Sequence, residues 1–385
     1  MKKKIAFIIP DMRGGGSERM VSRLSYFLND IYDITVILFD DIDTKYAIGC
    51  KKRCLHIPSE SSIHKKIKNV LKRKKAIQNM LKNENIDLAI SFTGTGNLSF
   101  GLCKTDTIKV ISCRNYLDYC RHSKLYKFLL KKSNYLLCNS KEMCEDIQSD
   151  MLLYKNKILY LTNFFDDKKI QRLCQQPLKE PFQSFYATHK VIINISRFTE
   201  GKGHHHLLKA FQILKEDCKE AGLLIIGEGG KLEKDIHKMV DNNKFKDDIL
   251  VVNFQDNPFC LLHHASVFAL TSYAEGFPNS LVEAMLSQTG VVSSKCKTGA
   301  VEILIDKENQ YGVLCSRFGL DFNSDYGSYD EEDIELASAL SKFMIDDDYR
   351  HNMEHQAYKR GMEFSVEHMK PTYIKYINTM MEGNL

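Results

Sequence analysis

The sequence predicts an α/β protein with two Rossmann-like domains, each built on a mostly parallel sheet, that face each other across a cleft. Short apolar runs alternate with helical stretches over residues 4–161, and the same alternation restarts at residue 190. Such alternation indicates βαβ units and therefore parallel sheets. The segment between the two runs has no clear period and holds two of the seven prolines, which is typical of a linker.

The first half is expected to form an N-terminal domain over residues 1–175. A Gly-rich loop should lead into a helix over Ser17–Leu28, and a basic helix is expected over Ile63–Leu81. Strands are expected at Lys4–Ile9, Ile34–Phe39, Ile86–Phe92, Lys109–Cys113, Tyr135–Cys138 and Lys157–Leu161.

The second half is expected to form a domain over residues 190–365, after a linker over 176–189. A helix is expected over His204–Leu214, and a C-terminal helix over 366–385 can pack back on the N-terminal domain. Strands are expected at Lys190–Ser196, Ala221–Ile226, Ile249–Asn253, Val267–Leu270 and Gly290–Ser293.

Composition places the chain among ordinary globular proteins, because 43% of the 385 residues are hydrophobic and 27% are charged. No stretch approaches the ~18–20 apolar residues of a membrane span. The first apolar run ends at Pro10, too early for a secretory leader, so we expect a buried strand and a cytoplasmic protein. The twelve cysteines form no CxxC pair and no zinc pattern, so we expect free thiols and no metal.

Charge divides the chain. Residues 1–180 hold 33 Lys+Arg and 19 Asp+Glu, whereas residues 181–385 hold 21 and 30. A basic half favours an anionic partner. Seven of its basic residues lie between His64 and Lys75, on the helix expected over Ile63–Leu81. This helix is either a solvated face or a surface that meets anionic lipid or a lipid-linked phosphate.

Two loops of the second half carry chemistry for an anionic ligand. In the segment 194–203 a strand ends at Arg197 and a tight Gly turn presents Lys202, so two cations on one loop suit a diphosphate. In the segment 275–285, Glu275 and Glu283 flank seven residues, and Asn279 or Ser280 can cap a helix whose N–H groups meet a phosphate.

These motifs resemble the retaining GT-B glycosyltransferases of family 4, in order along the whole chain. The resemblance rests on the Ser-Arg-Phe-x-x-Gly-Lys-Gly loop, the Glu-x7-Glu motif, the Gly227-Glu228-Gly229 turn and the Gly-rich loop over 14–19. It is strongest to bacterial transferases that extend lipid-linked oligosaccharides, including N-acetylgalactosamine transferases. A competing interpretation, a GT-B nucleotide-sugar epimerase, would need no acceptor surface.

The resemblance implies a role for each matching residue. Arg197 and Lys202 would bind the donor diphosphate, Glu275 the donor sugar and Glu283 the ribose, and the first three count as catalytic. Other donor-binding residues would be Gly15, Gly16, Gly227, Glu228, Phe254, Gly276, Phe277, Asn279, Ser280 and Leu281. Phosphate charge would be neutralised by these cations and helix dipoles, without a metal or another cofactor.

On the acceptor side, Arg114 stands where many relatives have a histidine. The basic helix would engage a lipid pyrophosphate and an anionic membrane through Lys65, Lys66, Lys72 and Arg73. The expected function is thus transfer of a hexose or N-acetylhexosamine from a nucleotide-sugar, with UDP preferred, to a lipid-linked glycan. The protein would act on the inner face of the cell membrane and would not bind nucleic acid. The donor sugar, the acceptor glycan and the linkage stay open.

Overall fold

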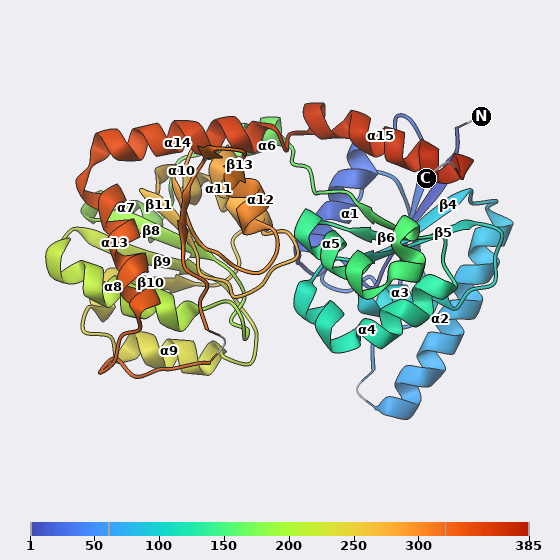
Figure 1. The fold of residues 1–385 in the computed structure, drawn as a ribbon, viewed down its shortest axis with the longest axis horizontal. Coiled ribbons are helices and arrows are strands. Elements are labelled where there is room, and N and C mark those ends of the chain that lie inside the picture. The colour runs from blue at the N-terminus through green and yellow to red at the C-terminus, as the bar shows by residue number, and fades with distance from the viewer. Residues whose placement is uncertain (1, 61, 320, 384–385) are drawn as a thin grey trace. The chain divides into compact units, whose positions relative to one another are not determined.

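The structure is a computed structural model that describes residues 2–60, 62–319 and 321–383. It divides into two compact units. Unit 1 comprises residues 1–165 and 366–385, and unit 2 comprises residues 166–365. Each unit is a parallel sheet covered by helices, which confirms the predicted fold class (Figure 1).

Unit 1 contains a seven-stranded parallel sheet in the order β3-β2-β1-β4-β5-β6-β7. Its strands are β1 (Lys4–Ile9), β2 (Asp33–Leu38), β3 (Lys51–Cys54), β4 (Leu88–Ser91), β5 (Ile108–Cys113), β6 (Tyr135–Cys138) and β7 (Ile158–Tyr160). We did not predict β3, because its Lys-Lys-Arg-Cys sequence lacks apolar alternation. Its charged side chains suit an edge strand, which has one unpaired side.

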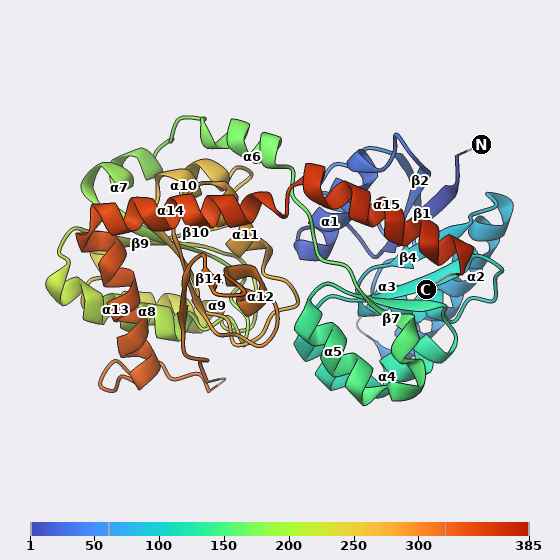
Figure 2. The ribbon, with the colours of Figure 1, turned by 45° about the horizontal axis from the view of Figure 1, so that its top comes forward.

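The two faces of this sheet bury different helices, since successive side chains of a strand point to opposite faces. Ile5 and Phe7 of β1 belong to a core that includes the C-terminal helix, whereas Ile8 belongs to a core with Ile77 and Leu81. The helices are α1 (Gly16–Phe27), α2 (Ile63–Asn83), α3 (Gly94–Gly101), α4 (Tyr116–Lys131), α5 (Lys141–Asp150), the 3-10 helix η1 (Leu152–Lys157) and α15 (Val366–Glu382). The last of these returns to pack on unit 1 (Figure 2).

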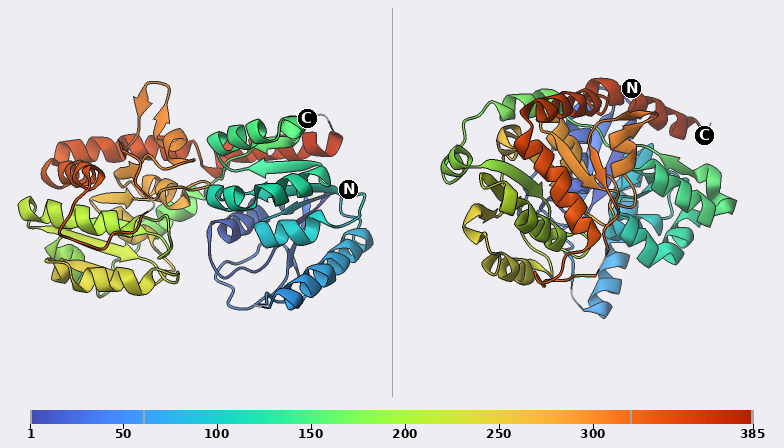
Figure 3. Two further views of the ribbon diagram at one scale, coloured as in Figure 1. Left: turned by 60° about the horizontal axis from the view of Figure 1, so that its bottom comes forward. Right: turned by 60° about the vertical axis from the view of Figure 1, so that its left-hand side comes forward.

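Unit 2 contains a six-stranded parallel sheet in the order β10-β9-β8-β11-β12-β15. Its strands are β8 (Lys190–Ile195), β9 (Ala221–Ile226), β10 (Ile249–Val252), β11 (Val267–Leu270), β12 (Val291–Ser294) and β15 (Val313–Cys315). A short antiparallel hairpin, β13 (Ile305–Asp306) with β14 (Asn309–Gln310), projects from this unit (Figure 3). The hairpin and β15 were not predicted, since each has only two or three residues.

Helices cover both faces of the unit 2 sheet. They are α6 (Asp167–Cys174), α7 (Phe182–Thr188), α8 (His204–Asp217), α9 (Glu233–Asp241), η2 (Lys246–Asp248), α10 (Phe259–His264), α11 (Asn279–Leu286), α12 (Ala300–Leu304), α13 (Glu331–Ile345) and α14 (Asp347–Met362). The segment 176–189, expected as a linker, contains α7 and groups with unit 2. Within the described residues, no helix combines the length and apolar character that crossing a membrane requires.

Candidate functional site

In unit 2 the two predicted loops meet at the carboxyl ends of the strands, where parallel sheets bind ligands. Lys202 Nζ lies 2.5 Å from Glu275 Oε1, so the cationic loop after β8 is joined to the first glutamate of the Glu-x7-Glu motif. Ser272 Oγ donates to the same Glu275 oxygen at 2.6 Å. The Glu275 carboxylate is thereby fixed by a cation and a hydroxyl in a largely buried position.

Two hydrogen bonds to backbone carbonyls hold the Lys202 loop against the end of β11. The Tyr273 N–H donates to the Gly201 carbonyl at 2.8 Å, and Thr271 Oγ1 donates to the Lys202 carbonyl at 2.8 Å. Gly203 has φ +64°, and a Cβ on it would lie 2.0 Å from the Thr271 carbonyl oxygen. A glycine is therefore required here for both conformation and space.

The other end of the loop is held against the turn that follows β9. The Phe198 N–H donates to the Gly229 carbonyl at 3.0 Å. A Cβ on Gly227 would lie 2.2 Å from the Ser196 carbonyl oxygen, and one on Gly230 would lie 2.0 Å from that of Phe198. Arg197, between these contacts, has an exposed side chain on a braced backbone.

The helix that follows Glu275 differs in one detail from the prediction. We expected Asn279 or Ser280 to cap it, but α11 begins at Asn279 and Pro278 occupies the N-cap without a side-chain hydrogen bond. Proline has a fixed φ that suits a helix start, so the chain enters the helix one residue earlier. Glu283 lies inside this helix and is 2% exposed.

The remaining unit 2 residues fall into two groups. Phe277 and Leu281 are buried, and the Phe277 ring packs on Phe364 with centroids 5.6 Å apart, so a ligand could meet them mainly through the backbone. Glu228 follows β9 and Phe254 follows the paired strand β10, so both lie at one edge of the sheet. Both are half-buried.

Sequence reasoning missed the groups that support this site. Ser272 and Thr298 both bond Glu275, the second by donating its hydroxyl to the Glu275 carbonyl. His204 Nε2 lies 3.0 Å from Ser196 Oγ, and burial lowers the pKa of His204 to about 3, so its ring is neutral beneath the Arg197 loop. Ser272 lies three residues before Glu275 in the sequence, and this short separation was the one sign that its hydroxyl could reach the Glu275 carboxylate.

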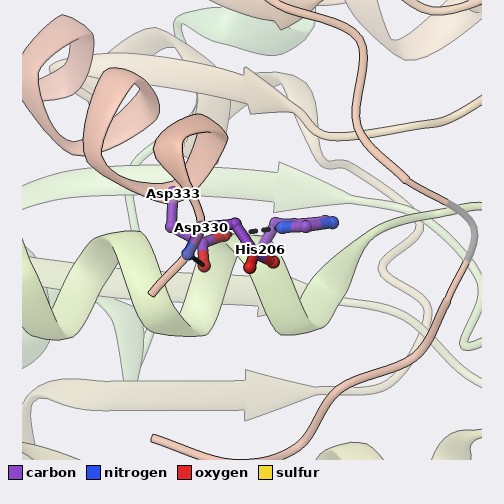
Figure 4. A group of neighbouring side chains, drawn as sticks. All are labelled: His206, Asp330 and Asp333. Carbon is purple, nitrogen blue, oxygen red and sulfur yellow. Dashed lines mark hydrogen bonds and ion pairs between the residues drawn. The ribbon is translucent and has the colours of Figure 1, made fainter. Parts of the chain in front are cut away.

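A different cluster in unit 2 contains His206, Asp330 and Asp333 (Figure 4). His206 Nδ1 lies 2.6 Å from Asp333 Oδ1, and the Asp330 backbone N–H donates to Asp333 Oδ2 at 3.0 Å. The buried Lys209 ammonium lies 3.9 Å from Asp333 as well, and it would repel a cation. We interpret the cluster as the N-terminal cap that fastens α13 to α8.

In unit 1 the Gly-rich loop lies between β1 and α1. Gly15 is the N-cap of α1, with φ +154°, and Gly16 is the first helical residue. A Cβ on Gly15 would lie 2.5 Å from Glu18 Oε2, so the loop wraps closely around this carboxylate. The assigned role of the two glycines at the donor stays a prediction.

Arg114 follows β5 directly and is partly buried. Its guanidinium donates to Asn163 Oδ1 and lies 5.4 Å from the centre of the Phe92 ring. Burial lowers the pKa of Arg114 from its ordinary value, yet a guanidinium stays protonated. Unit 1 thus has a cation at the carboxyl ends of its strands.

The basic helix α2 separates into two rows of side chains. One row contains the buried residues Arg73, Ile77 and Leu81 and the partly buried Val70. Ile67 and Leu71 of the other row are 58% and 56% exposed. The Ile63 side chain lies outside the described residues. One end of α2 projects beyond α3 and α4 (Figure 1), so the apolar stripe is only half packed.

The prediction that Arg73 faces a membrane is wrong. Arg73 is 3% exposed, and its Nε and Nη2 donate to the Ile57 carbonyl at 2.9 and 2.8 Å. Its guanidinium also lies 4.5 Å from the centre of the Phe39 ring. Lys65, Lys66 and Lys72 are exposed, so the free basic surface of α2 is carried by lysines.

Comparison with known proteins finds a family match in the second half of the chain. Residues 176–360 match the family model of the glycosyl transferases group 1. The chain is 26% identical, over 97% of its length and 99% of the relative, to the N-acetylgalactosamine-N,N'-diacetylbacillosaminyl-diphospho-undecaprenol 4-alpha-N-acetylgalactosaminyltransferase of Campylobacter jejuni. An uncharacterized glycosyltransferase of Methanocaldococcus jannaschii is 28% identical over 68% of this chain and 66% of its own length.

Solved structures confirm the fold. Anabaena HepE in complex with UDP and glucose has a TM-score of 0.74 at 18% identity and covers 98% of this chain and 100% of its own. Sucrose-phosphate synthase of Thermosynechococcus elongatus has a TM-score of 0.75 at 14% identity, over 99% and 100%. The chain thus carries a glycosyltransferase group 1 domain on a GT-B fold. The epimerase alternative gains no support from these relatives.

Proposed function

We propose that this glycosyltransferase moves a hexose or N-acetylhexosamine, with retention of configuration, from a UDP-sugar to a lipid-linked glycan. The observation that carries the proposal is the contact between Lys202 and Glu275, which joins a diphosphate-binding loop to a sugar-binding carboxylate. A nucleotide-sugar is the ligand that offers a diphosphate and a sugar side by side.

On the donor side, each group has a chemical task. Arg197 and Lys202 would neutralise the charge that develops on the leaving diphosphate, because charge-assisted hydrogen bonds are the strong ones. Glu275 would accept hydrogen bonds from the sugar hydroxyls, and the buried Glu283 would hold the ribose. These two cations provide the charge that a divalent metal provides elsewhere, so we expect turnover to persist in excess EDTA.

Retention and the UDP preference rest on the resemblance and on one neighbour. HepE was solved with UDP and glucose, which supports a uridine nucleotide for this fold. Glu228 and Phe254 lie at one edge of the unit 2 sheet, where they would line the base pocket. Gly15 and Gly16 would approach the donor from unit 1.

A lipid-linked acceptor is supported from two directions. Two Campylobacter jejuni relatives that match 97% of this chain are named as transferases acting on undecaprenol-diphosphate glycans. Independently, α2 presents Lys65, Lys66 and Lys72 beside the exposed Ile67 and Leu71. An amphipathic basic surface of this kind suits the inner membrane face, where each lysine contributes up to ~1 kcal/mol. Arg114 would lie near the acceptor or the donor sugar.

The test is a transfer assay with a panel of hexoses and N-acetylhexosamines activated with UDP, GDP or ADP, each with an undecaprenyl-diphosphate glycan in anionic vesicles. We expect one donor to give a product whose new anomeric centre has the donor's configuration, as measured by NMR coupling constants. An inverted product would contradict the retaining mechanism. Transfer only from GDP- or ADP-sugars would contradict the uridine assignment.

A further inference from the structure

A pocket of about 320 Å³ lies wholly within unit 1, among α2, α3 and α4. Its lining includes the first residues of α3, which follows the carboxyl end of β4, the side on which parallel sheets bind ligands. Its volume is at the lower end of the ~300–1,000 Å³ that is usual for small-molecule sites. The pocket therefore suits a ligand of one or two rings.

Charged side chains of both signs line this pocket. Lys66 and Asn69 line it from α2, Glu60 lines it from the segment before α2, and Asp118 and His122 line it from α4. A ligand that spans the pocket would thus meet carboxylates on both sides and one lysine ammonium.

Asp118 is held in position and still accessible. Tyr126 Oη donates to Asp118 Oδ2 at 2.8 Å, and His122 Nδ1 lies 3.2 Å from Asp118 Oδ1. Burial raises the pKa of Tyr126 well above its ordinary value, so its phenol keeps the proton that it donates. The Asp118 side chain is 37% exposed. Since a carboxylate has about four acceptor positions, capacity remains for ligand hydroxyls.

The N-terminus of α3 lies at this pocket, and a carboxylate beside it makes an anionic ligand unfavourable there. A helix N-terminus normally attracts an anion. Here Asp118 Oδ2 lies 3.5 Å from the position of a Cβ on Gly94, the first residue of α3, so a protein carboxylate already occupies that region. A phosphate would meet a like charge, whereas an uncharged hydroxyl can donate to the carboxylate.

The backbone around the pocket departs from regular geometry on both sides. His122 has φ −128° and ψ 23° within α4, which kinks the helix at the pocket wall. Thr93, just before α3, has φ +71°, which is rare for a β-branched residue. Such departures gather at functional sites because surrounding structure must maintain them at a cost.

We propose that this pocket binds an uncharged sugar residue of the acceptor, with Asp118 accepting from its hydroxyls and Tyr126 orienting the carboxylate. Lys66 then lies on the side where the sugar continues into its phosphate. This assignment rests on the proposed function, because it takes the acceptor to be a glycan.

The test measures binding without a donor, by saturation-transfer NMR with methyl N-acetyl-α-galactosaminide and, separately, with inorganic pyrophosphate. Asp118→Asn keeps the shape and removes the charge, and we expect at least ~10-fold weaker glycoside binding. Tyr126→Phe should weaken it less, because it removes only the orienting bond. Glu145→Gln, the same change at an exposed residue of α5, should leave glycoside binding unchanged. UDP affinity serves as the check that each variant is folded.

Glycoside binding that is equal in the wild type and in Asp118→Asn would overturn the assignment. Pyrophosphate that displaces the glycoside, and binds more tightly to Asp118→Asn, would show a phosphate site instead. In the transfer assay, the acceptor KM should rise about 10-fold in Asp118→Asn with a smaller change in kcat. Transfer with an unchanged acceptor KM would refute the sugar pocket alone, whereas Asp118-dependent binding without any transfer would refute only the proposed function.

Discussion

The two units present their charged groups in different ways. In unit 2 the cations stand on loops whose backbone is fixed by hydrogen bonds and by glycines that leave no room for a Cβ. In unit 1 the lysines of α2 stand on a helix whose outer row, with Ile67 and Leu71, is exposed. Binding of a compact diphosphate would call for the first arrangement, because pre-placed charges need no reorganisation. A fluid surface is compatible with the second.

This difference predicts where substitutions act. A substitution in unit 2 should remove one strong contact, so its effect should depend on the residue that is replaced. Substitutions on α2 should each remove a weak contact, so their effects on membrane binding should add up.

The largest effect is expected from Arg197→Gln combined with Lys202→Gln. Each charge-assisted hydrogen bond contributes ~1.5–3 kcal/mol, so kcat/KM should fall by about 10²–10⁴. Loss of Lys202 also leaves the largely buried Glu275 without its cation. Steady-state kinetics with varied donor measure this effect. Lys231→Gln, at an exposed lysine of unit 2, is the matched control. Unchanged kcat/KM in the double variant would refute the diphosphate assignment.

The next effect is expected from K65E/K66E/K72E, which reverses the charge of three exposed lysines of α2. At up to ~1 kcal/mol for each of the three lost cations, partition into anionic vesicles should fall by as much as ~100-fold. Arg73 is left unchanged, because its bonds to the Ile57 carbonyl hold the helix on the sheet. Sedimentation with vesicles at low and physiological salt measures the partition.

A matched control separates position from net charge. K124E/K127E/K131E makes the same change at exposed lysines of α4. If it weakens vesicle binding as much as the α2 variant, the overall charge of unit 1 attracts the membrane and α2 has no special role.

Motif residues were predictable from the sequence, but packing was not. The Lys202–Glu275 contact follows from two loops at the ends of neighbouring parallel strands. Arg73 was misplaced because the basic run was treated as one surface. Arg73, Ile77 and Leu81 are spaced four apart and so share one helix face. This spacing would have predicted that Arg73 is buried together with the two apolar residues. Asp118 gave no signal, because a pocket formed by three helices requires the tertiary structure.

A smaller effect tests the rigidity of the unit 2 loops with two neighbouring glycines. Gly229 and Gly230 both have positive φ, so alanine costs ~1 kcal/mol or more at either position. A Cβ on Gly229 meets nothing within 4 Å, whereas one on Gly230 would lie 2.0 Å from the Phe198 carbonyl. Gly230→Ala should therefore weaken UDP binding ~10-fold more than Gly229→Ala, as measured by calorimetry. Equal affinities would mean that the Arg197 loop adapts.

The last prediction, on stability instead of activity, concerns acid sensitivity, which should belong to unit 2. His204 and His205 are buried there, and burial lowers the pKa of each to about 3. Histidines in the unfolded chain have a pKa near ~6.5, so below that pH the unfolded state binds protons that the folded state does not bind. The contribution of each histidine to stability is thus fully present above pH ~6.5, and the free energy of unfolding falls by about 1.4 kcal/mol per pH unit for each histidine as the pH drops toward 3.

The test is urea unfolding of His205→Gln at pH 7 and pH 5. In this variant, the decrease in the free energy of unfolding between the two pH values should be smaller by roughly the contribution of one histidine. His355→Gln, at an exposed histidine, should not alter the loss. An identical pH dependence in wild type and His205→Gln would mean that the folded core accommodates the protonated ring. The buried histidines would then no longer support the view that unit 2 is the more rigid of the two units.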